Sequence, residues 1–310
     1  MAGLATILEA LGAYWSSPPV LVVVSVVAAS LATLAYVFLS NARNTRLRVS
    51  LLTGMYALTI FFWLFVAVSL VLCVSQAGMV AYRRNGVSVA AAAAVFTAYT
   101  ATALLSWIVW RRAPRSVLRR FAPRAPRADE RWLQESVDLR ARFEGVAPVR
   151  LGIVDRTEPL AMAVAGKEAH VLVSRGLLDA LDREEVEAVA AHELMHLKHR
   201  DAEFKVVSTI LSRVLFFDPF SKVFDPAVHR EREYLADEMG GRSTGRPAVL
   251  ASALLKIAER DAPPKAAWGI SIHGPRRGLF SRYPPLRERV DRLLLLSELL
   301  SENGKGPAGA

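Results

Sequence analysis

Three long stretches without a charged side chain constrain the fold of this 310-residue chain more than any other feature. They are residues 19–40, 51–74 and 87–110. Each is long enough to cross a bilayer as a helix, and helices in the core of water-soluble proteins seldom run this far without a charge. The sequence therefore predicts a membrane domain, residues 1–110, with about three transmembrane helices.

The positive charge of the protein is concentrated around these stretches. No Asp or Glu occurs between residues 10 and 128, where there are twelve arginines, whereas residues 128–310 hold 27 basic and 28 acidic side chains. The net charge of +10 therefore indicates contact with membrane lipid, and we do not expect nucleic acid as a partner. Arginines are most frequent in the loops after the first and third stretches. The positive-inside rule then predicts a multi-pass protein of the plasma membrane, with everything after Trp110 in the cytoplasm.

The rest of the chain is predicted to form a linker and a soluble domain. Residues 111–128 repeat Ala-Pro-Arg three times, which favours an extended path along the lipid headgroups. Residues 129–310 should be mainly α-helical with a small β-sheet. The expected helices include 130–143, 247–260 and 285–302, and the expected strands are 149–154, 161–164 and 170–174, with a hairpin turn at Gly166-Lys167. Residues 204–224 suit an interfacial or packed helix, and residues 261–283 suit a lid or a surface loop.

Two candidate metal ligands lie on one predicted helix, which Asp182 caps and Glu185 completes as a capping box. His192 and His196 stand four residues apart, so both imidazoles lie on one face and can reach a single ion. Glu193 projects beside them and can deprotonate a water held by that ion without being a ligand. This pattern of residues predicts a catalytic metal centre.

A catalytic zinc normally has three protein ligands, so one more is required. A second predicted helix, from Asp225-Pro226 to Gly240-Gly241, carries His229, Glu233 and Asp237 on one face. We predict that Glu233 is the third ligand and that Asp237 accepts the outer ring N–H of a ligand histidine. The expected cofactor is one Zn²⁺ per chain. The alternative for this segment is a solvated, charged helix.

These motifs resemble a known family. His-Glu-x-x-His followed by Glu-x-x-x-Asp is similar to the gluzincin metallopeptidases, and the segments 173–178 and 191–201 resemble the membrane-bound M48 peptidases of the HtpX and Ste24 type. Residues 283–290, beginning Tyr283-Pro284-Pro285, resemble the His-Pro-Pro-Leu segment of that family. The resemblance implies a gluzincin-type zinc peptidase domain, polypeptide substrates that are misfolded or membrane proteins, and a role for Tyr283 in stabilising the oxyanion.

The sequence thus predicts a membrane-anchored zinc endopeptidase, with Glu193 as the general base and an edge strand that holds the substrate by strand addition. Three alternatives remain, of which a basic membrane protein that binds nucleic acid is disfavoured by the nearly neutral soluble domain. Residues 230–234 are also similar to the M56 sensor peptidases, in which the spans would sense a ligand. The protein would otherwise be a catalytically idle membrane scaffold with a structural zinc, although such a site has no need of Glu193. The sequence leaves the oligomeric state open.

Overall fold

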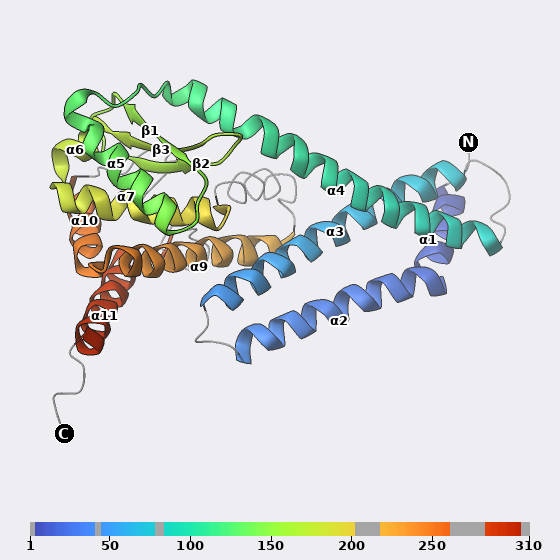
Figure 1. The fold of residues 1–310 in the computed structure, drawn as a ribbon. Coiled ribbons are helices and arrows are strands. Elements are labelled where there is room, and N and C mark those ends of the chain that lie inside the picture. The colour runs from blue at the N-terminus through green and yellow to red at the C-terminus, as the bar shows by residue number, and fades with distance from the viewer. Residues whose placement is uncertain (1–3, 41–44, 78–83, 202–217, 261–282, 305–310) are drawn as a thin grey trace. The chain divides into compact units, whose positions relative to one another are not determined.

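The computed structural model describes residues 4–40, 45–77, 84–201, 218–260 and 283–304. These residues are mainly helical with one small sheet, which confirms the predicted fold class (Figure 1). The chain divides into two compact units, Met1–Ile108 with Leu211–Phe224 and Val109–Ile210 with Asp225–Ala310. Most of the predicted interfacial segment and almost all of the predicted lid lie outside the described residues.

The first unit contains α1 (Leu4–Trp15), α2 (Pro18–Ser40), α3 (Thr45–Ala77) and the beginning of α4 (Arg84–Phe121). Among the described residues, two helical segments are long and apolar enough to cross a membrane, Pro18–Phe38 and Val49–Val71. They coincide with most of the first two predicted spans. The third predicted span, residues 87–110, lies within α4 and is not one of these two, so its crossing of the membrane stays a prediction.

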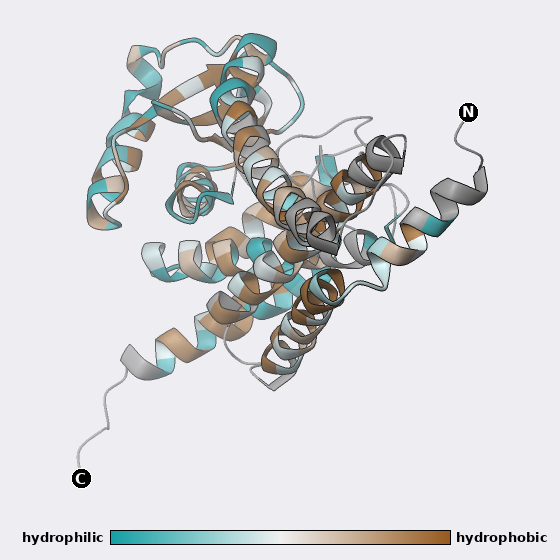
Figure 2. Cartoon of the chain, turned by 90° about the vertical axis from the view of Figure 1, so that its right-hand side faces the viewer, coloured by the Kyte–Doolittle hydropathy of each residue, from teal (hydrophilic) through white to brown (hydrophobic). Residues whose placement is uncertain are grey.

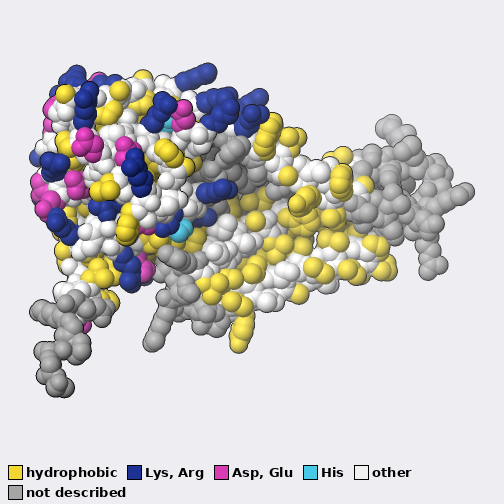
Figure 3. Space-filling model, viewed as in Figure 1, with side chains coloured by type: hydrophobic (Ala, Val, Ile, Leu, Met, Phe, Trp, Pro, Cys, Tyr) yellow, Lys and Arg dark blue, Asp and Glu magenta, His cyan; other side chains and the backbone are white. Residues whose placement is uncertain are grey.

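Large apolar side chains cover the outside of these helices. Runs of hydrophobic residues extend along the helices (Figure 2), and hydrophobic side chains dominate the visible surface of α2 and α3 (Figure 3). The exposed side chains include Leu21, Val22, Val26, Leu70, Val71, Phe96 and Tyr99. A water-soluble domain rarely exposes so much contiguous apolar surface, whereas lipid tails would cover it at no cost. This surface supports membrane association of the first unit.

The second unit is built on a three-stranded sheet in the order β1-β3-β2. β1 (Val149–Val154) runs parallel to β3 (Ala169–Ser174), and β2 (Ala161–Val164) pairs with β3 in the antiparallel sense through the predicted hairpin turn. The three strands therefore lie where the sequence predicts them. Alternating residues point to opposite faces of the sheet, and each face has its own hydrophobic cluster.

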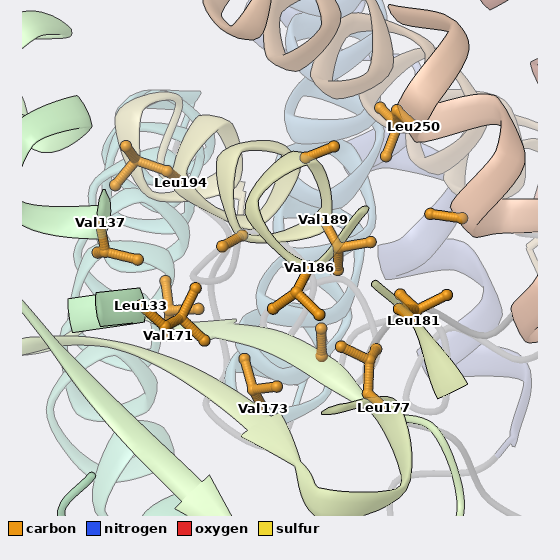
Figure 4. Close-up of a cluster of buried hydrophobic side chains, with 14 of the residues drawn as sticks. Leu133, Val137, Val171, Val173, Leu177, Leu181, Val186, Val189, Leu194 and Leu250 are labelled. Carbon is orange, nitrogen blue, oxygen red and sulfur yellow. The ribbon is translucent and has the colours of Figure 1, made fainter. Parts of the chain in front are cut away.

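One face of the sheet is covered by α5 (Arg131–Phe143) and α7 (Arg183–Lys198), and α10 (Pro247–Arg260) packs against α7. Figure 4 shows Val186, Val189 and Leu194 of α7 packed among side chains of the sheet, α5 and α10. The short helix α6 (Arg175–Ala180) connects β3 to this layer. All but one of the residues from Glu185 to Leu197 of α7 are buried, so this helix is held rigidly between the sheet and α10.

The other face of the sheet is covered by the end of α4, where Val117, Leu118 and Phe121 pack against β2 and β3. The predicted extended path of residues 111–128 is therefore wrong for its first part, because α4 continues to Phe121 with Pro114 inside it. A proline inside a helix costs about 3 kcal/mol. Burying apolar side chains against the sheet, worth about 1.5–3 kcal/mol each when complete, offsets that cost.

After α4 the chain follows the outer edge of β1. Arg124 exchanges two backbone hydrogen bonds with Ile153, each of 2.9 Å, and its guanidinium binds both carboxylate oxygens of Glu130 at 2.7 and 2.6 Å. Glu130 ends the short 3-10 helix η1 (Ala128–Glu130) that leads into α5. This edge of the sheet is consequently occupied by the chain itself.

The last two helices are α9 (Pro219–Thr244) and α11 (Leu286–Gly304). The predicted bounds of α9 are wrong at both ends, since it begins before Asp225 and runs through Gly240 and Gly241. Gly240 does not end the helix but lies where α9 passes close to α7. A Cβ atom added there would lie 3.1 Å from the Cα atom of His192, so the glycine lets α9 cross α7 closely at a candidate ligand.

Candidate metal centre

The start of α7 is fixed by the predicted capping box, which the structure confirms. The backbone N–H of Glu185 donates to Asp182 Oδ1 at 2.9 Å, and the N–H of Asp182 donates to Glu185 Oε2 at 3.0 Å. Glu185 is buried and also accepts from Ser252 and Lys256 of α10. The rotational setting of α7 is thereby fixed two turns before the first candidate ligand.

The two histidines and Glu233 converge at one point in the core of the second unit. Nε2 of His192 lies 3.6 Å from Glu233 Oε2, and Nε2 of His196 lies 3.5 Å from Glu233 Oε1. In a tetrahedral zinc site with bonds of about 2.0–2.2 Å, two ligand atoms lie roughly 3.4 Å apart. The separations between these three side chains therefore fit zinc ligation.

The chemistry around His192 also fits a cation. Its Nε2 atom is buried and finds no hydrogen-bond partner within the described part of the chain. Such a buried polar atom is costly unless a ligand satisfies it. Burial opposes a positive charge on this ring, but Asp237 and Glu233 outweigh burial and raise the pKa of His192 to about 9. The surroundings thus favour a positive charge at this position, whether it is a proton or a metal ion.

Asp237 lies beside the other ring nitrogen of His192. Its Oδ1 atom lies 3.0 Å from Nδ1, which is the position that the sequence assigns to it. The side chain of Arg289, from α11, donates two hydrogen bonds of 2.7 Å to Asp237 and lies 3.6 Å from Glu233 Oε2. Burial alone would raise the pKa of Asp237, but Arg289 outweighs it and holds that pKa below its usual range. Arg289 was not predicted, because nothing near it in the sequence points to α9.

A second carboxylate holds the outer ring nitrogen of His196. Asp201 Oδ2 lies 3.0 Å from Nδ1 of His196, and Arg232 of α9 donates to the other oxygen of Asp201. Neither residue was assigned a role from the sequence. Each histidine therefore presents Nε2 to Glu233 while an aspartate holds its Nδ1, the arrangement that fixes metal-binding imidazoles.

Glu193 lies close to the same point, but its contacts with the two histidines differ from those of Glu233. A carboxylate oxygen of Glu193 lies within 4.8 Å of a ring nitrogen of each histidine, and the side chain is buried. We find no hydrogen bond to this carboxylate within the described residues. Glu233 faces both Nε2 atoms at ligand spacing, whereas Glu193 lies beside the same histidines, and the assignment of Glu233 as third ligand and Glu193 as base stays a prediction.

Two further histidines and Tyr283 lie in the described part of the chain. His229, one turn before Glu233, lies 3.3 Å from Asp225 on its own helix. His199 forms the end of α7 and lies 2.9 Å from the sulfur of Met239. Tyr283 directly precedes the Pro284-Pro285 segment before α11, and its role in stabilising an oxyanion stays a prediction because the residues before it lie outside the described chain.

The sequence of the chain is similar to known proteins of one family. Residues 127–296 match the sequence profile of peptidase family M48. A protease HtpX homolog of Pyrococcus furiosus is 32% identical over 207 residues, which cover 52% of this chain and 72% of that protein. A protease HtpX homolog of Dictyoglomus thermophilum is 27% identical over 258 residues, covering 68% and 85%. The crystal structure of S. mikatae Ste24p aligns with 90% of this chain and 99% of its own, at 12% identity and a TM-score of 0.43.

Proposed function

The chain belongs to peptidase family M48, and from this premise we propose that it is a membrane-anchored zinc endopeptidase whose metal ligands are His192, His196 and Glu233. Membership of the family indicates a membrane-associated zinc metalloprotease. The assignment of the individual residues, the hydrolysis of internal peptide bonds and the physiological role are parts of the proposal.

One observation carries the proposal. The Nε2 atoms of two histidines face the two oxygens of one glutamate at 3.6 and 3.5 Å, and a second glutamate without a hydrogen bond in the described chain lies beside them. A structural zinc site is usually closed by four protein ligands, whereas a catalytic site has three and an open position. Three ligands and a spare carboxylate support catalysis over a scaffold that uses zinc for folding alone.

Each residue of the metal centre has its own role in the proposed hydrolysis. Zinc, when bound, acts as a Lewis acid and lowers the pKa of its water to about 7. Glu193 accepts a proton from the attacking water and returns it to the leaving amine. Asp237 and Asp201 hold the two imidazoles in the tautomer that leaves Nε2 free for the metal. Tyr283 remains the proposed donor to the oxyanion.

The sheet supports a way of holding a polypeptide substrate. Arg124 occupies the outer edge of β1, whereas the outer edge of β2 has no strand partner in the described chain. Leu160 bonds to Ser174 of β3, so alternation directs the backbone groups of Ala161 and Ala163 outward. β2 also packs directly against α7, the helix with both histidines. An extended peptide added to β2 would therefore run beside the metal centre.

We further propose that the second unit works in the cytoplasm, at a membrane surface with anionic lipid, on misfolded or membrane proteins. The arginine-rich loops support the orientation, and the mixed acidic and basic side chains on the visible face of the second unit support contact with water (Figure 3). The role in protein quality control rests on the resemblance to HtpX-type proteases.

Metal removal and restoration test the proposal. Detergent-solubilised, full-length protein should contain about one zinc per chain and should cleave casein, an unfolded polypeptide. A chelator should abolish cleavage, and a stoichiometric zinc supplement should restore it. Zinc-loaded protein that cleaves no polypeptide would instead support the idle scaffold. A pull-down from cells with the Glu193→Gln variant, which should bind substrates without cutting them, would then identify the natural substrates.

A further inference from the structure

The side chains of His196, Asp201 and Arg232 form a continuous buried chain of contacts. His196 Nδ1 lies 3.0 Å from Asp201 Oδ2, and Arg232 donates to Asp201 Oδ1. The three side chains are only 3%, 2% and 8% exposed. Removing one member of a buried, charged group leaves the others without compensation, so these contacts are strongly interdependent.

The backbone makes an unusual turn to bring Asp201 to this position. Helix α7 ends at Lys198, and Arg200 then adopts a φ of +57°, in the left-handed region that residues other than glycine rarely occupy. Asp201 follows at once and reaches back to the imidazole of His196, two residues before the end of the helix. A strained conformation of this kind persists where the surrounding contacts require it.

Arg232 lies next to the proposed third ligand in the sequence. On α9, Arg232 contacts Asp201 while its neighbour Glu233 faces the Nε2 atoms of both histidines. The two adjacent residues thus engage His196 from both sides, one through Asp201 at Nδ1 and one at Nε2. The ion pair between Arg232 and Asp201 thus joins α9 to the end of α7, directly beside Glu233, the proposed third ligand.

We propose that Asp201 and Arg232 are a positioning pair for the metal centre: Asp201 orients His196 with Nε2 toward the metal, and Arg232 acts through Asp201. This inference rests on the proposed function as a zinc enzyme. It also predicts that the pair affects metal affinity and ligand geometry, whereas an ion pair that merely ties two helices together would affect stability alone.

Zinc affinity of the full-length, detergent-solubilised protein tests this role. Competition with a chromophoric chelator should show that Asp201→Asn and Arg232→Met each bind zinc about 10–100-fold more weakly than the wild type. The double variant should be no weaker than the weaker single variant, because Arg232 acts through Asp201. Arg232→Lys, which keeps a positive charge beside Asp201, should recover part of the affinity.

A spectroscopic measurement and a matched control separate positioning from general stability. The visible absorption spectrum of the cobalt-substituted protein reports ligand geometry, and it should change in Asp201→Asn and in Arg232→Met. Lys198→Met breaks a 2.6 Å ion pair with Glu144 at the same end of α7 and should leave both the affinity and the spectrum at wild-type values. Circular dichroism tests whether each variant is folded. If Asp201→Asn does not fold, Arg232→Met and Arg232→Lys still show whether the pair positions the metal centre.

Three outcomes would overturn the inference. They are wild-type affinity with a wild-type cobalt spectrum in the single variants, losses that add in the double variant, and an equal loss in Lys198→Met. Wild-type protein that binds no zinc would overturn the proposed function as well. The two failures are therefore distinguishable.

Discussion

Two glutamates, Glu193 and Glu233, lie beside the same pair of histidines. A single substitution tests whether Glu193 is the base. Glu193→Gln keeps the shape of the side chain but cannot accept a proton from water. Zinc content and melting temperature should therefore stay close to the wild-type values, while casein cleavage should fall at least about 100-fold, within the range that general-base catalysis supplies. Metal analysis, thermal unfolding and a cleavage assay measure these three quantities.

Glu187→Gln is the matched control for this substitution. Glu187 lies on the same helix and pairs only loosely with Arg183, at 3.7 Å, so this change should leave cleavage at the wild-type rate. If Glu193→Gln cleaves casein as fast as the wild type does, Glu193 is not the base.

The identity of the third ligand gives a second prediction. Glu233→Ala removes the carboxylate that faces both Nε2 atoms, so the purified variant should lose most of its zinc. His229→Gln, one turn earlier on α9, removes an imidazole that contacts Asp225 and should retain zinc. Metal analysis of both variants decides between these residues. Zinc retained in the first and lost in the second would make His229 the ligand.

The metal-centre residues were predictable to different degrees. His192, Glu193 and His196 follow from one helical repeat, and Asp237 follows from its spacing of four residues after Glu233. Asp201 depends on the left-handed turn at Arg200, which the sequence does not signal because it is not a glycine. Arg289 lies 52 residues beyond Asp237, so only tertiary packing brings them together.

At the scale of helices and strands, the close crossing of α9 and α7 depends on Gly240. Alanine is usually favoured over glycine in a helix by about 1 kcal/mol. Here the added Cβ would lie 3.1 Å from the backbone of His192, which cannot move aside like a flexible side chain. We expect Gly240→Ala to lower both the melting temperature and the zinc affinity, because α9 carries Glu233 and Asp237.

Gly12→Ala provides the comparison for this prediction. Gly12 lies inside α1, and an added Cβ there meets nothing within 4 Å. The melting temperature of this variant should be equal to or above that of the wild type. A Gly240→Ala protein that is stabilised to the same extent would show that the crossing has room for a methyl group.

The contact between Arg124 and Glu130 gives a pH-dependent prediction. The hydrogen-bonded Arg124 guanidinium holds the pKa of Glu130 below its usual value of 4.5. A lowered pKa means that the pair stabilises the fold above about pH 4.5 and that this contribution is lost as the pH falls through the folded-state value. Glu130→Gln should therefore melt below the wild type at pH 7, and the difference should shrink in strong acid.

Glu135→Gln removes the same charge from an exposed position on α5 and should melt close to the wild type at both pH values. Thermal unfolding of the three proteins in detergent, from pH 7 downward, provides the measurement. A difference between Glu130→Gln and the wild type that grows on acidification would contradict the sign.

Local patterns predicted the elements that local interactions determine. The capping box fixes the start of α7, and alternating apolar residues place the strands. The extents of α4 and α9 were mispredicted because both helices continue through residues that normally stop a helix, Pro114 and Gly240. In each case a contact with another element, the sheet or α7, outweighs the local preference.

For the whole molecule, the distribution of arginine predicts the orientation in the membrane. Protease added outside intact cells should leave the second unit uncut, because that unit follows the most arginine-rich segment and should lie in the cytoplasm. Immunoblotting against the C-terminus after digestion measures the result, and permeabilised cells provide the positive control. Digestion of the C-terminal part in intact cells would reverse the proposed topology.

The end of α4 packs on the sheet, so the folded domain begins before the residues that match the family. The match to the sequence profile of family M48 begins at residue 127, but the hydrophobic cluster on that face already includes Val117, Leu118 and Phe121. A fragment that begins within residues 122–127 would keep every residue of the family match but lack the end of α4, which covers Met162 and Leu172. Such a fragment, expressed alone, should associate with itself or be degraded, so the matched residues by themselves should not form an active enzyme.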